Sequence, residues 1–114
     1  MSLSIQRIIS GSQLTTAAAT YYTAAAGEKM KISMMSLTNS AATAVTATVY
    51  LVPSGGTAGV TNLILSARSI PASGGEPYIV RSALGQTIPA GGTIQALASV
   101  AASITIVASG TLEN

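Results

Sequence analysis

The residues of this chain that could take part in catalysis or metal binding are few. Five lysines or arginines and three glutamates are present, whereas histidine, cysteine and aspartate are absent. Without these residues the chain cannot form a Ser-His-Asp or Cys-His nucleophile, and it lacks the usual ligand sets for zinc and calcium. We therefore expect no metal, no other cofactor and no catalytic residue.

The glutamates are the remaining candidates for acid–base chemistry. Two carboxyl groups about 5 to 10 Å apart could hydrolyse a glycosidic bond, and Glu28 with Glu76 is a possible pair. Both glutamates are expected at strand edges, however, where a rim charge is the simpler interpretation. A Ser-Lys dyad with Lys29 or Lys31 has no support from spacing, because serine is abundant throughout the sequence. We expect a protein that is not an enzyme.

The basic residues suggest at most a small charged patch. Lys29 and Lys31 are two residues apart, so a strand places them on one face, and Arg68 or Arg81 could lie near them. One interpretation is a patch for an acidic protein partner or nucleic acid, and the other, which we favour, is a solvated strand face. The five basic residues are too few and too scattered to follow a phosphate backbone, so we expect no nucleic-acid partner.

The aromatic residues of the chain are four tyrosines. Tyr50 is expected on the side of its strand that faces away from the core. A tyrosine in that position could stack on a sugar ring, or it could anchor a subunit interface, where tyrosine is enriched. We favour the interface and keep carbohydrate binding as an alternative.

The low charge of the whole chain favours an assembled protein. Charged residues make up 7% of the sequence, against about 25% in an ordinary soluble domain. Because charge is depleted in the cores of subunit interfaces, we expect homo-oligomeric contacts to cover part of the surface. A monomer with a Ser/Thr-rich surface is the alternative. The side chains expected in the interface are Tyr50, Val52, Ile64, Leu97, Tyr21 and Tyr22.

The elements that position these residues are predicted to be strands. In the stretch 44–52, Val45, Ala47, Val49 and Leu51 share one face, and Thr46, Thr48, Tyr50 and Val52 share the other. Similar alternation occurs over 28–37, 62–70, 93–100 and 103–109, with glycine and proline between the strands. Seven to eight strands at this spacing predict an all-β fold, either an antiparallel β-sandwich or a barrel. We expect one domain over residues 13–114, preceded by an N-terminal arm or edge strand at 1–12.

Several details of this arrangement are open to test. Strands 28–37 and 44–52 are predicted to pair as a hairpin. The apolar phase changes near Met34 and Met35, which indicates either a bulge there or burial of both faces at that end of the strand. The segment 13–26 is ambiguous, and strand with loops is favoured over helix. Gly11 and Gly110 are expected to interrupt strands, and Val100 is expected to point inward.

The sequence gives no sign of a membrane segment. The mean hydropathy is +0.55, yet no run of about 18 apolar residues occurs. The N-terminal residues also lack the charged and apolar pattern of a secretory signal, so we expect synthesis in the cytoplasm and no membrane contact.

Two parts of the chain resemble small structural proteins of tailed bacteriophages. They are 37–40 with 45–56, and 88–96 with 108–110, and the resemblance extends from Thr20 to Glu113. It implies a β-sandwich virion component made in the host cytoplasm, and we expect an antiparallel, jelly-roll-like sandwich of seven to eight strands. The component is most directly a capsid decoration (cement) protein bound to the major capsid protein or other virion proteins. The alternative is a head-fibre, collar or tail component with a receptor- or carbohydrate-binding role. The residues 2–9 are then a candidate arm onto the shell.

Overall fold

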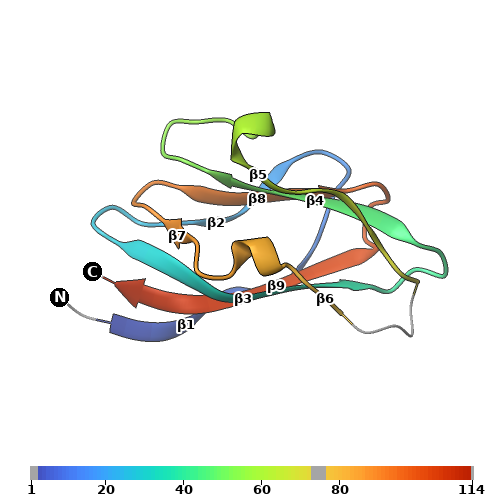
Figure 1. Ribbon diagram of the computed structural model, residues 1–114, viewed down its shortest axis with the longest axis horizontal. Helices are drawn as coiled ribbons and strands as arrows, with labels where there is room; N and C mark the ends of the chain where they lie inside the picture. Colours follow the sequence, from blue (N-terminus) through green and yellow to red (C-terminus); the bar gives the residue numbers. More distant parts are fainter. Residues whose placement is uncertain (1–2, 73–76, 114) are drawn as a thin grey trace.

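Two antiparallel sheets face each other in the computed structural model, which describes residues 3–72 and 77–113 (Figure 1). The molecule is elongated, with extents of 45 × 26 × 19 Å. Glu76, one half of the possible glycosidase pair, lies outside the described residues. The predicted all-β sandwich is confirmed.

Nine strands build the two sheets within the described residues. Sheet 1 contains β1 (Leu3–Gln13), β9 (Ile104–Glu113), β3 (Lys29–Asn39) and β6 (Tyr78–Ile79), with β7 (Thr87–Ile88) also paired to β3. Sheet 2 contains β2 (Ala19–Thr23), β8 (Thr93–Ala98), β4 (Val45–Val52) and β5 (Leu63–Ile70). Two short 3₁₀ helices, η1 (Val60–Asn62) and η2 (Arg81–Ala83), lie in the connections. The count exceeds the expected seven to eight because β6 and β7 are only two residues long.

The strand order is that of a jelly roll. The antiparallel pairs β1–β9, β2–β8, β3 with β6 and β7, and β4–β5 are nested along the chain. This is the order produced when one long antiparallel ribbon folds over itself, and β3–β9 and β4–β8 then join its turns into two sheets. The jelly-roll-like prediction is confirmed.

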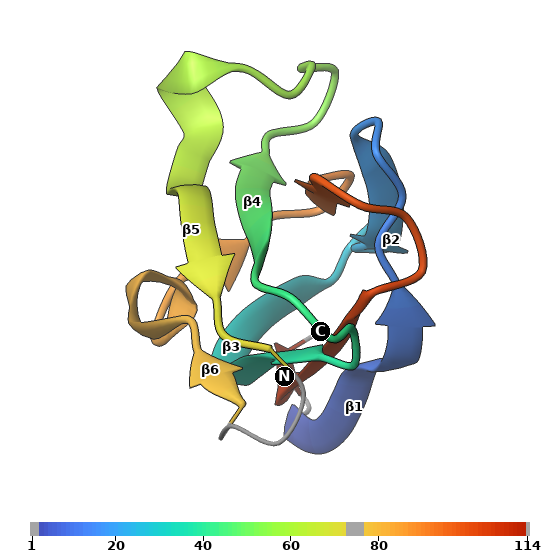
Figure 2. The ribbon, with the colours of Figure 1, turned by 90° about the vertical axis from the view of Figure 1, so that its right-hand side faces the viewer.

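The predicted hairpin between 28–37 and 44–52 is wrong. Strands β3 and β4 lie in different sheets, as Figure 2 shows. The side chain of Asn39, which is 5% exposed, explains the crossing. Its Nδ2 donates to the carbonyl oxygens of Thr43 (2.9 Å) and Ile70 (3.1 Å), and its Oδ1 accepts from the N–H of Ala41 (2.8 Å). These bonds hold 40–44 as an arch between the sheets.

The core follows the predicted alternation in most strands. Val45, Ala47 and Val49 of β4 are buried, as are the inward residues of β9, Ile104, Ile106 and Ala108. A shift of register between Ile32 and Met34 confirms the bulge in β3 and keeps Met35 and Leu37 buried after it. The inward placement of Val100 is wrong, because β8 ends at Ala98 and the side chain of Val100 is 50% exposed.

Neither glycine that was expected to interrupt a strand does so. Strand β1 continues through Gly11, which has a φ of 130° and lies where the register shifts between Ile9 and Ser12. Strand β9 continues through Gly110, which pairs with Gln6 on one side and Ile32 on the other. A Cβ at Gly110 would overlap the carbonyl oxygen of Lys31 and the side chain of Ile8, so this glycine allows β3 and β9 to approach.

The ambiguous segment 13–26 contains a strand and loops, as favoured. Strand β2 covers Ala19–Thr23, and its register with β8 shifts between Thr20 and Tyr22. Gly27, which could have capped a helix, lies in a turn with a φ of 80°, where the N–H of Glu28 donates to the carbonyl of Ala25 (3.1 Å).

Candidate functional site: two sheet faces of different character

The outer face of sheet 2 carries no charged residue in the described part of the chain. Strands β2, β4 and β8 contain none, and the one in β5, Arg68, lies opposite the buried Ala47. We call this surface the uncharged face, and it consists of Thr46, Thr48, Tyr50, Leu63, Thr93, Gln95 and Leu97. All of these side chains are partly exposed. The uncharged face therefore presents no ionic group to solvent or to a partner protein.

Tyr50 occupies the middle of the uncharged face. It lies directly opposite Gln95 on β8 and Leu63 on β5, and Leu97 lies opposite the neighbouring Thr48. Directly opposed side chains on one face of a sheet are in contact range, and diagonal neighbours are about 7–8 Å apart. Tyr50, Leu63 and Leu97 thus form an apolar centre bordered by threonine and glutamine.

Two polar side chains on this face, Gln95 and Thr48, have hydrogen-bond partners within the protein. Gln95 Nε2 donates to Thr93 Oγ1 (3.1 Å), and Thr48 Oγ1 accepts from the N–H of Ala67 (3.0 Å), which has a positive φ of 43° in β5. A polar group that already has a protein partner loses less on removal from water than an unpaired one. The uncharged face is therefore suited to being covered.

The predicted interface residues separate into three groups. Tyr50 and Leu97 lie together on the uncharged face, as described. Ile64, Tyr21 and Tyr22 are half-buried and also pack against the core, and their place in an interface stays a prediction. The placement of Val52 in an interface is wrong, because its side chain is only 3% exposed. Leu63 is a member of the face that the alternation did not predict.

The two tyrosines of β2 serve the fold. The hydroxyl of Tyr21 donates to the carbonyl of Gln13 (3.3 Å) and accepts from the N–H of Thr15 (3.2 Å), which ties β2 to the end of β1. Partial burial raises the pKa of the Tyr22 hydroxyl, and the negative charge of Glu28 raises it further. Both tyrosines stabilise the entry to sheet 2.

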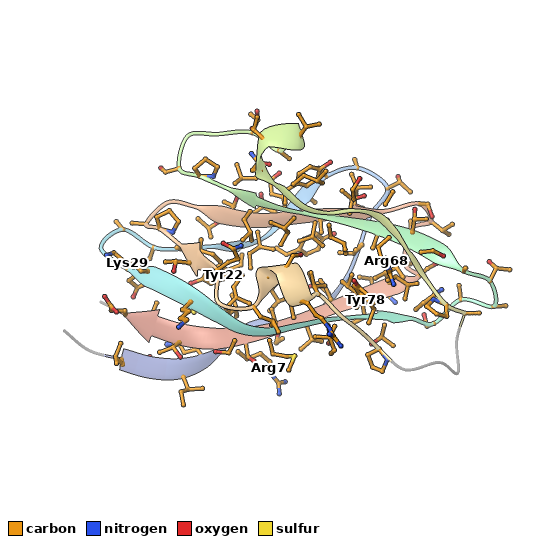
Figure 3. All side chains as sticks on the ribbon, viewed as in Figure 1. Arg7, Tyr22, Lys29, Arg68 and Tyr78 are labelled. Atoms are coloured by element: carbon orange, nitrogen blue, oxygen red, sulfur yellow. The ribbon has the colours of Figure 1, made fainter. Side chains whose placement is uncertain are left out.

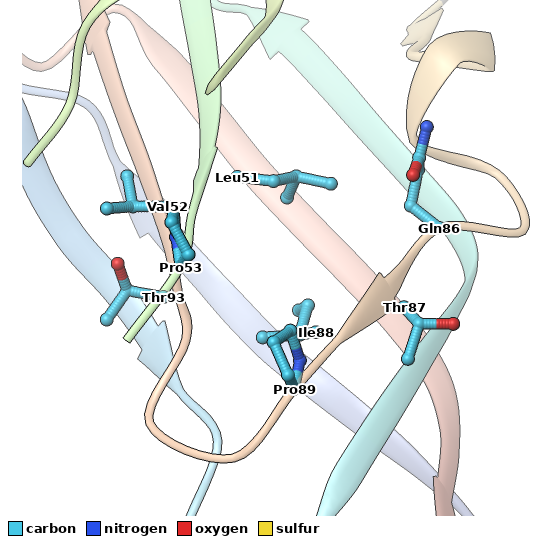
Figure 4. Close-up of a pocket in the computed structure, with 8 residues that line it drawn as sticks. All are labelled: Leu51, Val52, Pro53, Gln86, Thr87, Ile88, Pro89 and Thr93. Carbon is cyan, nitrogen blue, oxygen red and sulfur yellow. The ribbon is translucent and has the colours of Figure 1, made fainter. Parts of the chain in front are cut away.

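Val52 lies beside a small hollow at the end of the sandwich (Figure 4). The hollow has a volume of about 240 Å³ and is lined by Leu51, Val52, Pro53, Gln86, Thr87, Ile88, Pro89 and Thr93. Small-molecule sites usually measure about 300–1,000 Å³ and carry several convergent polar groups. This hollow is smaller and has no charged side chain, so it does not resemble a catalytic or cofactor site.

The outer face of sheet 1 is different in charge. Lys29 and Lys31 point to the same side of β3, as predicted, and Arg7 of β1 joins them on that face. Arg68 does not join them: its guanidinium stacks on the ring of Tyr78, 4.8 Å from the centroid, at the other end of the molecule (Figure 3). Arg81 lies in η2. The sequence did not indicate Arg7, because only the pairing of β1 with β9 brings it near.

No three potential ligands among His, Cys, Asp and Glu come together within residues 3–72 and 77–113. In that same part of the chain no helix has the length and hydropathy to cross a membrane.

No protein-family model matches the chain, and no curated protein matches it in sequence. Among solved structures, a chain of infectious bursal disease virus Gx strain is similar in fold, with 17% identity and a TM-score of 0.51. A chain of the Gt strain has 15% identity and a TM-score of 0.47, and the VP2 subviral particle of that virus has 17% and 0.47.

These structural neighbours are chains of a virus and of a subviral particle. The alignments cover 97%, 96% and 97% of this chain but only 30%, 32% and 31% of theirs, so the chain spans about a third of their length. At this identity the likeness concerns the fold alone.

Proposed function

We propose that this chain is a non-enzymatic structural protein of a tailed-phage virion, and that it decorates and stabilises the capsid shell. The observation that carries the proposal is the uncharged face of sheet 2. A chain with so few charges remains in solution more easily when neighbouring proteins cover such a face. The viral origin of the Gx strain neighbour and the resemblance to phage structural proteins support a virion setting.

The mechanism is burial of surface at subunit contacts. A stable interface covers about 800 Å² on each partner, which is a modest part of the 5863 Å² surface of this protein. Contacts among copies of the chain and contacts to the major capsid protein would bridge neighbouring shell subunits. Because each bridge exists only in the assembled state, it stabilises that state over the dissociated one.

The proposal is tested on virions of the phage that encodes the chain, compared with virions from which its gene has been deleted. We expect the protein in the wild-type particles and a lower temperature of shell rupture, measured by DNA release, in the deletion particles. Adding the purified protein back should restore the wild-type temperature. Equal rupture temperatures with and without the protein would contradict a stabilising role.

A fibre, collar or tail component that binds a receptor is the second candidate, favoured by the position of Tyr50 beside Gln95 on an open face. Tyrosine with a neighbouring amide is a combination that binds sugars. Copy number distinguishes the two, since a decoration protein is present in hundreds of copies and a fibre or collar protein in a few dozen or fewer. A glycan array, with Tyr50→Ala as the control, tests the sugar-binding part.

A further inference from the structure

The outer face of sheet 1 combines positive charge with exposed apolar side chains. We infer that this face docks on a protein surface that presents carboxylates around an apolar patch, and that within the proposed function this partner is the shell protein. We call it the basic face, and it consists of Leu3, Ile5, Arg7, Lys29, Lys31, Met34, Thr111 and Glu113. The inference rests on the proposed function, and it says which face of the subunit is turned toward the shell.

The register of three strands places these residues in rows. Lys29 lies across from Glu113, Lys31 lies across from Thr111, and Arg7 lies across from Ser109. Three cations therefore share the face with one carboxylate, and all three cations are exposed. The uncharged face on the other sheet has no such field, so the two sides of the sandwich suit different partners.

Apolar side chains lie in the same rows as the cations. Ile5 of β1 is 89% exposed and shares a row with Lys31, while Leu3 is 61% exposed and shares the row of Lys29. Met34, in the row of Arg7, is 44% exposed. Large apolar side chains this exposed and this close together are typical of a contact surface.

A groove of about 510 Å³ runs along this face. Leu3, Lys29, Lys31, Thr87, Thr111 and Glu113 line it. The lysine ammonium groups and the threonine hydroxyls can donate hydrogen bonds to a carboxylate. Hydrogen bonds between charged groups are stronger than those between neutral groups. Glu113 lines the same groove, so its two lysines leave a net positive charge there, which suits an acidic side chain of a docked protein.

A protein partner fits this face better than nucleic acid or a lipid surface does. Three cations are few for following a phosphate backbone, and no tyrosine among the described residues lies on this face to stack on a base. Lipid anchoring by charge generally needs a cluster of four or more basic residues.

The test measures the association of purified protein with shells that lack it, by biolayer interferometry, at about 0.05 and 0.5 M NaCl. For the wild type we expect the association rate to fall at least about tenfold at the higher salt, since steering by charge is screened. We expect Lys29→Glu with Lys31→Glu to reduce association at low salt at least about tenfold. The control with the same change of net charge is Arg68→Glu with Arg81→Glu, whose positions are off the basic face, and it should stay within about threefold of wild type.

Ile5→Ser separates the apolar contribution from the ionic one. We expect it to accelerate dissociation while leaving the salt dependence of association unchanged. Carbodiimide, which couples lysine directly to a carboxylate in contact, should join Lys29 or Lys31 to an aspartate or glutamate of the shell protein. Thermal unfolding of each variant verifies that it is folded.

The possible failures are distinct. If wild-type protein does not bind the shells, both the proposed function and this inference fail. If wild type binds but the Lys29/Lys31 variant and its control behave alike, the proposed function stands and this inference is overturned. Binding of the wild type to duplex DNA or to anionic phosphatidylserine vesicles, lost in the Lys29/Lys31 variant while shell binding is kept, would also overturn it.

Discussion

A single missing side chain, at Gly110, determines how closely β3 and β9 approach. Gly110→Ala would place a methyl group against the carbonyl oxygen of Lys31, a backbone atom of β3, and against the side chain of Ile8. Because a paired strand cannot easily move, we expect a loss of about 1–3 kcal/mol in the free energy of unfolding, measured by urea denaturation.

Gly59→Ala is the matched control for this substitution. The backbone of Gly59 is extended, with a φ of −172°, and the nearest atom to an added Cβ is the carbonyl oxygen of Thr57 at 4.0 Å. We expect a change within about 0.5 kcal/mol. Equal effects of the two substitutions would contradict the close approach at Gly110.

The raised pKa of the Tyr22 hydroxyl predicts a loss of stability in alkali. Above the ordinary tyrosine value of about 10, the unfolded chain releases this proton while the folded protein retains it. The unfolded state then binds fewer protons, so the free energy of unfolding falls as the pH rises through the folded pKa. Denaturation at pH 8 to 11 should show this fall in the wild type and a smaller one in Tyr22→Phe. Identical pH profiles of stability for the wild type and Tyr22→Phe would contradict this contribution of Tyr22.

For single residues, the sequence predicts correctly at some positions and wrongly at others whether a side chain points toward the core. Alternation correctly placed Tyr50 away from the core, because β4 is regular from Val45 to Tyr50. It wrongly placed Val52, at the end of β4, on the exposed face. It also wrongly placed Leu63 on the buried face, because register shifts between β4 and β5 change which residues of β5 point outward. A period of two residues contains no information about such shifts.

Among the elements, the arch between β3 and β4 depends on Asn39. Asn39→Ala would leave the carbonyl of Ile70 and the N–H of Ala41 without their partner in a largely buried site. We expect a loss of about 1–3 kcal/mol in the free energy of unfolding. The neighbouring Ser40→Ala removes only a long hydroxyl contact to Ser103 (3.3 Å) and should change it by less than about 0.5 kcal/mol. An unchanged free energy of unfolding in Asn39→Ala would show that the arch does not need this side chain.

The same arch marks the limit of predicting elements from the sequence. The stretches that became β3, β4, β5, β8 and β9 are recognisable from alternation, and so is the sandwich class. Their partners are not, because alternation identifies the buried face and not the neighbouring strand. Residues 38–43 read as a polar connection suited to a hairpin, and only the burial of Asn39 in the structure reveals a crossing between sheets.

For the whole molecule, the separation of charge between the two sheets is the main property. The low charge content is visible in the sequence, but its concentration on one side is not, since it depends on which strands share a sheet. Arg7 and Lys31 are far apart along the chain and come to one face through β9. This arrangement predicts two contact surfaces of different chemistry.

Self-association through the uncharged face is tested by Leu97→Glu, which places a charge next to Tyr50. We expect the wild type to form oligomers and the variant to elute as a monomer of 11.3 kDa, measured by size exclusion with light scattering. Leu84→Glu, at an exposed site next to η2, is the matched control and should leave the oligomer intact. A wild type that stays monomeric at all concentrations would contradict a homo-oligomeric contact through the uncharged face.

We expect neighbouring proteins to cover the uncharged face in the assembled particle. A cryo-electron microscopy reconstruction of the virion at side-chain resolution measures this directly, through the exposed surface of Tyr50, Leu63 and Leu97. We predict that all three side chains are buried against adjacent subunits on the capsid shell. A map in which sheet 2 faces solvent, or in which the protein is absent from the particle, would contradict the claim.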